Sequence, residues 1–128
     1  MTGPKTLGEL IAADVGAAAR EAGRPAPRVV AGFPIVLTDE TESARKMASK
    51  AFAMYGTLPS YQAMLEHEGV EGPADIAMIG DEKTLEAAIE RLAAAGVTDL
   101  NANVIPDGKD REGSMKRTWD FLADLARR

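Results

Sequence analysis

Two short segments of this chain, one around Gly80 and one around Gly3, combine backbone freedom with groups that can hold an anion or a hydroxyl. Gly80 precedes a predicted helix whose N-cap is Asp81, and the free N–H groups at a helix start carry partial positive charge. Gly3 lies between Thr2 and Thr6, where it would let the backbone approach a ligand while the hydroxyls donate hydrogen bonds. Ordinary helix capping explains the same residues. A ligand site and a set of caps both stay open.

Residues that carry most enzymatic chemistry are scarce. The chain has one histidine and no cysteine, so neither a zinc site nor a Cys/His nucleophile pair can form. It contains no GxxxxGK[ST], GxGxxG or GxSxG motif. His67, between Glu66 and Glu68, is expected to be a solvated surface histidine, with a titrating general base as the alternative. We therefore assign no catalytic residue and no metal ligand from the sequence.

Two amides share one face of the last predicted strand. Asn101 and Asn103 alternate there with Leu100, Ala102 and Val104, as successive residues of a strand do. In a buried sheet such amides need partners, which can be each other, a loop or a ligand. The sequence supports a structural and a functional interpretation equally.

The stretch from Ile79 to Ile105 predicts a helix that leads into a strand, which is half of a parallel β/α unit. Asp81 occupies the N-cap position, and Gly96 is placed to end the helix in the left-handed conformation. The apolar residues between them recur at helical spacing: Leu85, Ala88, Ile89, Leu92 and Ala93. The strand runs over Asp99–Ile105, and Pro106 ends it.

A second strand is predicted over Val29–Leu37, which is nearly all apolar, as strands covered on both faces of a parallel sheet are. Pro34 lacks an N–H group, so either a bulge lies there or one side of the strand is unpaired at that point. Residues 75–79 are short and apolar. They predict either a minor strand or a packed lead into the following helix.

One helix is predicted before the Val29–Leu37 strand in the chain and another after it. The spacing of Thr6 and Glu9 indicates a capping box before the first, whose apolar face is Leu7, Leu10, Ile11, Val15, Ala18 and Ala22. Thr38 and Asp39 are expected to cap the second, which ends at Gly56 and has an apolar stripe of Ala44, Met47, Ala48, Ala51, Phe52 and Tyr55.

Two further helices complete the pattern. One begins near Pro59, ends at Gly69 and directs three residues inward: Tyr61, Met64 and Leu65. The last helix is expected to bury one face formed by Met115, Trp119, Leu122 and Ala126. Trp119 and three methionines are predicted to be core residues: Met47, Met54 and Met64.

Length and charge limit the classes of protein and partner. A chain of 128 residues without cysteine has room for a single domain, residues 1–128, with a core and no disulfide. No stretch could span a bilayer, and MTGPKTLGEL lacks the regions of a signal peptide, so we expect a cytoplasmic location. Fifteen basic and twenty acidic residues give a net charge of -5 without a basic cluster, which argues against a nucleic-acid partner.

Three runs of the sequence, TGPKTLGELI, AGRPAPRVVAGFPIVLTDE and ADIAMIGDEKTLEAAIERLAAAGVTDL, together resemble the C-terminal part of the luciferase-like monooxygenase family. The nearest branch is the oxidoreductases that use the deazaflavin coenzyme F-420. This resemblance implies an α/β fold that is part of a TIM (β/α)8 barrel with parallel strands. Val29–Leu37 would be its seventh strand and Asp99–Ile105 its eighth, with strands one to six absent. Asn101 and Asn103 depart from the family's usual apolar eighth strand.

The resemblance also implies a function. The parent chemistry is hydride transfer between the deazaflavin, or alternatively FMN, and an organic substrate. Loops at the catalytic face of such barrels often bind phosphate, which raises the cofactor-binding interpretation of Thr2, Gly3, Gly80 and Asp81. Activity would require self-association or a second chain that supplies the missing strands. The alternative is a non-catalytic α/β module that dimerises or binds a phosphorylated ligand.

Overall fold

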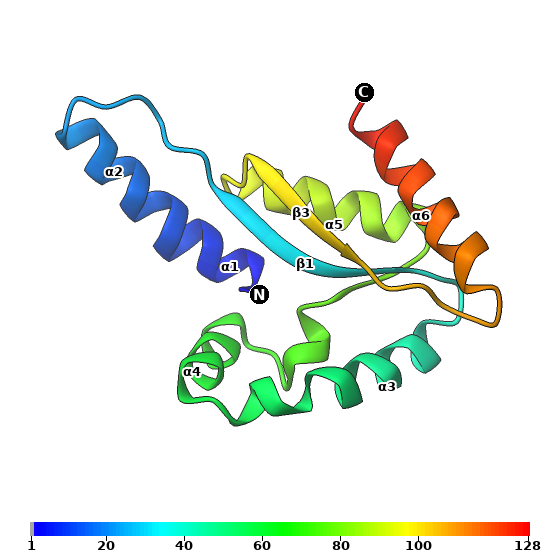
Figure 1. Ribbon diagram of the computed structural model, residues 1–128. Helices are drawn as coiled ribbons and strands as arrows, with labels where there is room; N and C mark the ends of the chain where they lie inside the picture. The colour runs from blue at the N-terminus through cyan, green and yellow to red at the C-terminus, as the bar shows by residue number, and fades with distance from the viewer. Residues whose placement is uncertain (1) are drawn as a thin grey trace.

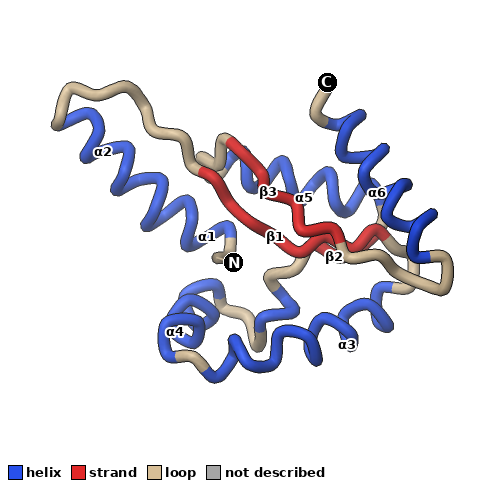
Figure 2. The backbone as a smooth tube through the Cα atoms, in the orientation of Figure 1, coloured by secondary structure: helices blue, strands red, loops and turns tan. Residues whose placement is uncertain are grey.

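The computed structural model describes residues 2–128, and within them three parallel strands form a sheet in the order β2-β1-β3 with helices on both faces (Figures 1 and 2). In chain order the elements are α1 Pro4–Thr6, the π-helix η1 Leu7–Ala12, α2 Ala13–Glu21, β1 Val30–Leu37, α3 Thr41–Phe52, the 3-10 helix η2 Ala53–Thr57, α4 Pro59–Glu68, the 3-10 helix η3 Pro73–Asp75, β2 Met78–Gly80, α5 Glu82–Ala94, β3 Asp99–Val104 and α6 Arg111–Leu125. The predicted α/β class with parallel strands is confirmed.

β1 is the central strand. It pairs in parallel with β3 from Val30 to Ile35 and with β2 from Ile35 to Leu37. The register with β3 is continuous past Pro34, whereas pairing with β2 begins one residue later. The prediction that one side of the strand is unpaired at Pro34 is therefore confirmed, and no bulge is present. The predicted minor strand near residues 75–79 is confirmed as β2.

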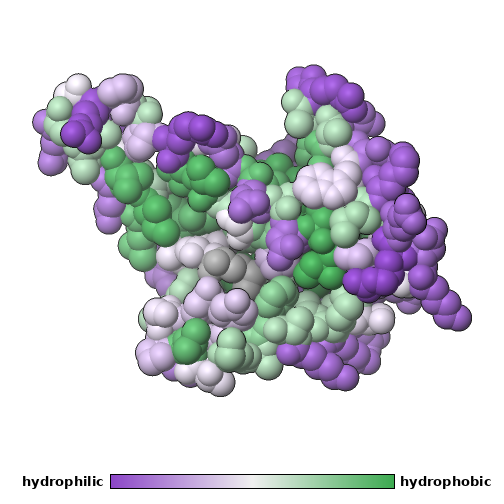
Figure 3. Space-filling model, in the orientation of Figure 1, coloured by the Kyte–Doolittle hydropathy of each residue, from purple (hydrophilic) through white to green (hydrophobic). Residues whose placement is uncertain are grey.

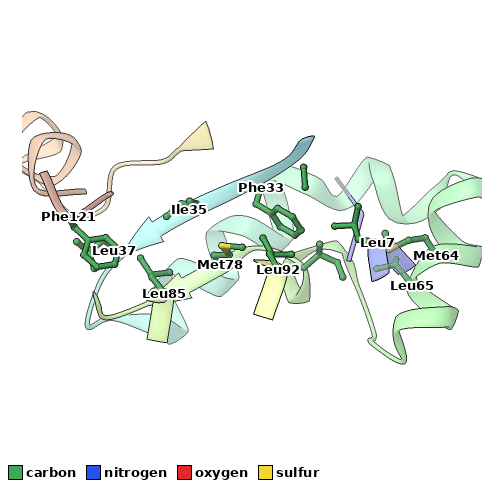
Figure 4. Close-up of a cluster of buried hydrophobic side chains, with 12 residues drawn as sticks. Leu7, Phe33, Ile35, Leu37, Met64, Leu65, Met78, Leu85, Leu92 and Phe121 are labelled. Carbon is green, nitrogen blue, oxygen red and sulfur yellow. The ribbon is translucent and has the colours of Figure 1, made fainter. Parts of the chain in front are cut away.

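The main core lies on the face of the sheet that α5 and α6 cover. Phe33 and Ile35 of β1 are buried there against Leu85 and Leu92 of α5 and Phe121 of α6 (Figure 4). A smaller cluster on the opposite face packs the even-numbered residue Val36 against Ala44 and Ala48 of α3. Both faces are thus covered around the second half of β1, as predicted, but Val30 at its start is 61% exposed.

Local signals around α5 act as the sequence predicts. The Asp81 carboxylate accepts a hydrogen bond from Thr84 N at 2.8 Å, which satisfies one of the free N–H groups of the first turn. Gly96 has φ 92°, a left-handed conformation that glycine adopts without steric cost. The shorter α4 likewise ends at Gly69 with φ 75° and buries Met64 and Leu65.

The first helix differs from its prediction. Its N-cap is Gly3, its first residue is Pro4, and Thr6 is already helical, so the predicted capping box at Thr6 and Glu9 is wrong. The cap comes from another helix, because the Glu68 carboxylate of α4 accepts hydrogen bonds from the backbone N–H groups of Lys5 and Thr6 at 3.2 and 2.6 Å.

The apolar face predicted for this helix is mostly exposed. Leu7 is buried, but Leu10 is 47% exposed, and Ile11 and Val15 are also exposed. Figure 3 shows hydrophobic atoms gathered over α2 and the start of β1. The prediction of a buried face fails because helical spacing identifies which residues share a face of the helix. It does not show whether another element within residues 2–128 covers that face.

The inward face of α6 is shifted by one residue from its prediction. Ser114, Thr118 and Phe121 are buried, whereas Trp119 is 48% exposed. The two polar residues are satisfied locally, because Thr118 Oγ1 donates to the Ser114 carbonyl at 2.9 Å and Ser114 Oγ accepts from Asp107 N at 2.9 Å. Burying these two polar residues costs little free energy because each is hydrogen-bonded. They occupy the inward face in place of Trp119, so the prediction that Trp119 is a core residue is wrong.

Three smaller predictions also change. Met54 is exposed, because α3 ends at Phe52 and Met54 lies in the 3-10 turn that follows. The N-cap of α3 is Glu40, with no side-chain cap, so Thr38 and Asp39 do not cap it as predicted. His67 is only partly exposed, with Nε2 3.1 Å from Glu9 Oε2. Within residues 2–128, no helix has the length and apolar character needed to cross a membrane.

We predict that Leu85→Ala destabilises the fold by about 2–5 kcal/mol, because a fully buried leucine loses its contacts and leaves a cavity. The free energy of unfolding measured in urea tests this. Leu10→Ala is the matched control, and it should change the free energy of unfolding by less than about 0.5 kcal/mol because Leu10 is exposed. Equal losses in the two variants would contradict the assigned core.

Stability should also fall in acid through Asp99, at the start of β3. Hydrogen bonds from Arg28 and then from Thr98 lower the pKa of Asp99 to about 2. Because this folded-state pKa lies below the unfolded value of about 3.9, the stabilisation is complete above that value and is lost as the pH falls toward 2. Urea denaturation midpoints measured from about pH 5 down to about pH 2, the range in which this carboxyl group titrates, test this prediction. Asp99→Asn should flatten the decline, whereas Asp14→Asn, at an exposed position, should not.

Candidate functional site at the carboxyl edge of the sheet

The carboxyl ends of the strands meet at one edge of the sheet, because all three strands are parallel. Thr38 follows β1 and joins these ends. Its backbone N donates to the Gly80 carbonyl at the end of β2 at 2.9 Å. Its Oγ1 donates to the carboxylate of Asp107, beyond the end of β3, and accepts from Glu40 N at 2.9 Å. This edge is where ligands bind in parallel α/β sheets.

Helix α6 is attached to the same edge by two polar contacts. Ser114 Oγ accepts from Asp107 N, and the guanidinium of Arg117 donates to the Leu37 carbonyl at 3.2 Å. Among residues 2–128, Arg117 has no carboxylate within ion-pair distance. Its positive charge is therefore directed at the edge of the sheet and is available to a bound anion.

A cavity of about 480 Å³ opens beside these residues. Its lining is Leu37, Thr38, Asp39, Asp81, Glu82, Lys83, Glu86 and Arg117. Lys83 and Arg117 can donate hydrogen bonds to phosphate or hydroxyl oxygens, and the four carboxylates can accept them from hydroxyl groups. Four acidic side chains outnumber two basic ones in this lining, so hydroxyl groups find more partners there than negatively charged oxygens, which only Lys83 and Arg117 can hold.

The start of α5 already holds an anion of its own. Hydrogen bonds from Thr84 lower the pKa of Asp81, so its carboxylate is ionised and occupied by the first turn of the helix. A phosphate at this helix start would have to displace Asp81 from Thr84 N. The side chains of Lys83 and Arg117 are therefore better placed than the helix backbone to bind an anion in this cavity.

The structure divides the four predicted site residues into two groups. Gly80 and Asp81 lie at the carboxyl edge, and Asp81 lines the cavity. A Cβ at Gly80 would lie 2.7 Å from Thr84 Cγ2, so close packing against α5 requires the glycine. Thr2 and Gly3 precede α1 and are not among the residues that line the cavity. A Cβ at Gly3 would overlap the Glu68 carboxyl group.

Sequence reasoning missed three residues of this edge. The sequence predicts Thr38 only as a helix cap and indicates no role for Asp107 or Arg117. A signal was available for Thr38 and Asp107, because residues that directly follow parallel strands converge at one edge. Arg117 could have been found only with the correct inward face of α6. Within residues 2–128, no group of three or more acidic or histidine side chains could hold a metal ion.

Comparison with known proteins gives one informative likeness. No protein-family model and no curated protein matches this chain. Among solved structures, the coenzyme F-420-dependent tetrahydromethanopterin reductase of Methanopyrus kandleri is similar over 90% of this chain, with a TM-score of 0.66 and 21% sequence identity. The match covers 40% of the reductase chain. At this identity the likeness shows the fold, which is that of a partial TIM-barrel-like fragment, as the family resemblance implies.

We predict that Thr38→Val lowers the free energy of unfolding by about 1–3 kcal/mol, because it leaves Asp107 and Glu40 N without a buried partner. Urea denaturation measures the change. Thr41→Val, at an exposed position at the start of α3, is the matched control and should shift the value by about 0.5 kcal/mol or less. A Thr38 variant as stable as this control would show that Thr38 does not join the strand ends.

Proposed function

We propose that this chain acts as the C-terminal portion of a luciferase-like oxidoreductase that uses coenzyme F-420, with FMN as the alternative cofactor. The observation that carries the proposal is the fold, which is similar to that of an F-420-dependent reductase over 90% of this chain. The three runs of sequence that resemble the luciferase-like family support the same conclusion. The chain spans 40% of the length of that reductase, so a complete barrel would also need strands from outside these 128 residues.

The cavity at the carboxyl edge fits the hydroxylated phosphate chain that deazaflavin and flavin cofactors carry. In this proposal Lys83 and Arg117 hold the phosphate oxygens, and Asp81 accepts hydrogen bonds from hydroxyl groups. Gly80 lets β2 approach α5 closely and so places Asp81 at the mouth of the cavity. Thr2 and Gly3 remain proposed cofactor contacts on the loop before α1, held in place through Glu68.

The bound cofactor would supply hydride transfer to or from an organic substrate. The residues of this chain bind and orient it. None of them is proposed as a proton donor or acceptor, and His67, which lies beside Glu9, is not part of the cavity lining.

A second candidate function is a non-catalytic module that binds a phosphorylated ligand. The observation in its favour is that Arg117 lines the cavity without a carboxylate within ion-pair distance among residues 2–128. In the oxidoreductase function the cofactor's ring contributes to binding, whereas in the module the phosphate group alone is recognised.

Titration of the purified chain with coenzyme F-420, FMN and riboflavin, followed by fluorescence, tests the proposal, with light scattering to give the oligomer mass. We expect saturable binding of F-420 or FMN and at least about tenfold weaker binding of riboflavin, because one lost charge-assisted contact is worth about 1.5–3 kcal/mol. Binding of inorganic phosphate with no response to either cofactor would support the module instead. No binding of any of these ligands would contradict both functions.

A variant pair tests the assigned cation. Arg117→Leu should weaken cofactor binding at least about tenfold. Lys116→Leu is the matched control, since it removes a neighbouring charge that pairs with Asp120 at 2.6 Å and does not line the cavity. Equal affinities of the two variants would show that Arg117 does not hold the cofactor.

A further inference from the structure

A second hollow lies on the opposite face of the sheet, where the first halves of β1 and β3 lack a covering helix. Its floor is formed by Gly32 and Pro34 of β1 and by Asn101 and Asn103 of β3, and its volume is about 230 Å³. It shares no residue with the cavity at the carboxyl edge. The space exists because Gly32 has no side chain; a Cβ there would meet its nearest atom only at 3.9 Å.

The floor of the hollow is polar on one side only. Asn101 is paired across the ladder with Gly32, and Asn103 with Pro34, so neither neighbour offers a polar side chain. Both amides are exposed, and within residues 2–128 neither side chain has a hydrogen-bond partner. Each amide presents one acceptor and two donor positions. Two such groups, two residues apart on one strand, form a polar edge at the base of the hollow.

The wall of the hollow is aromatic. Tyr55 of η2 and Tyr61 of α4 have ring centroids 5.0 Å apart at an interplanar angle of 53°, and Phe52 lies next to Tyr55 at 6.1 Å. All three rings are only partly buried, so part of their surface faces the hollow. Aromatic faces of this kind stack on the flat rings of heterocycles.

The size of the hollow sets the size of its ligand. A cavity of about 150 Å³ holds one benzene ring, whereas sites for drug-sized molecules begin near about 300 Å³. At about 230 Å³, this hollow fits one flat ring with its polar substituents and is too small for a whole nucleotide cofactor.

We propose that this hollow binds a flat, single-ring nitrogen heterocycle whose edge carries a cyclic amide or imide. The ring lies against Tyr55 and Tyr61, and its N–H and C=O groups pair with Asn101 and Asn103, as asparagine pairs with the edge of a base. The ring belongs either to a free small molecule or to the end of a larger ligand. The site uses none of the residues proposed to hold the cofactor phosphate, and it is a property of this chain as described, before any further barrel strand covers this face of the sheet.

A titration of the full chain with uracil, followed by the NMR signals of the side-chain amides, tests this site. We expect saturable shifts of Asn101 and Asn103. The N,N′-dimethyl derivative of uracil keeps the ring but lacks its N–H groups, so it should bind at least about tenfold more weakly. Equal binding of the two compounds, or no saturable shift with uracil, would overturn the proposal.

Variants separate the amides from the aromatic wall. Asn101→Leu and Asn103→Leu should each weaken uracil binding at least about fivefold, because the added side chain cannot pair with the ring edge. Gln62→Leu is the matched control, since the Gln62 amide already donates to the Gly56 carbonyl at 3.2 Å. Circular dichroism checks that each variant is folded. Unchanged affinity in both folded asparagine variants would overturn the assignment, and the comparison of the two ring compounds tests it on the unaltered chain. Once uracil is shown to bind, the same amide shifts on addition of FMN would place the ring at the end of a larger ligand, and no shift with FMN would leave a free single ring as the ligand.

Discussion

Pairing of β1 on both of its edges is the constraint on which the rest of this structure depends. Without it the short β2 would have no partner, and β3 would lose the only strand with which it forms a ladder in residues 2–128. The buried residues Phe33 and Ile35 hold α5 and α6 on one face, while Val36 holds α3 on the other. Because the strand is fixed from both faces, the position of its carboxyl end is fixed as well.

That end explains why the cavity lies where it does. Parallel pairing brings the residues after each strand to one edge, where Thr38 links Gly80 to Asp107 and Arg117 binds the last carbonyl of β1. The first half of β1 differs from its carboxyl end. There the even-numbered residues have no helix over them, and Gly32 lies beside Asn101 in an open hollow. One strand thus has a polar cavity at its end and a second, aromatic hollow beside its first half.

The sequence predicts correctly what depends on neighbouring residues. The cap at Asp81, the stop at Gly96 and the buried Leu85 follow from spacing within one helix. Contacts between distant residues could not be predicted, such as the cap that Glu68 supplies to Thr6 and the bond from Thr38 to Asp107, which join residues 62 and 69 positions apart. Such contacts decide burial too. Ser114 and Thr118 are buried because each forms a hydrogen bond there. A pattern that counts only apolar residues places Trp119 on the inward face instead.

Scalar couplings across hydrogen bonds, measured by NMR on labelled protein, test the central position of β1 most directly. The structure predicts a coupling from Thr38 N to the Gly80 carbonyl carbon on one side and from Ile105 N to the Ile35 carbonyl carbon on the other, since these bonds are both 2.9 Å long. Observation of both would place β1 between two parallel partners. Absence of either coupling in folded protein, or couplings that join β2 directly to β3, would contradict the arrangement and remove the basis for the site at the carboxyl edge.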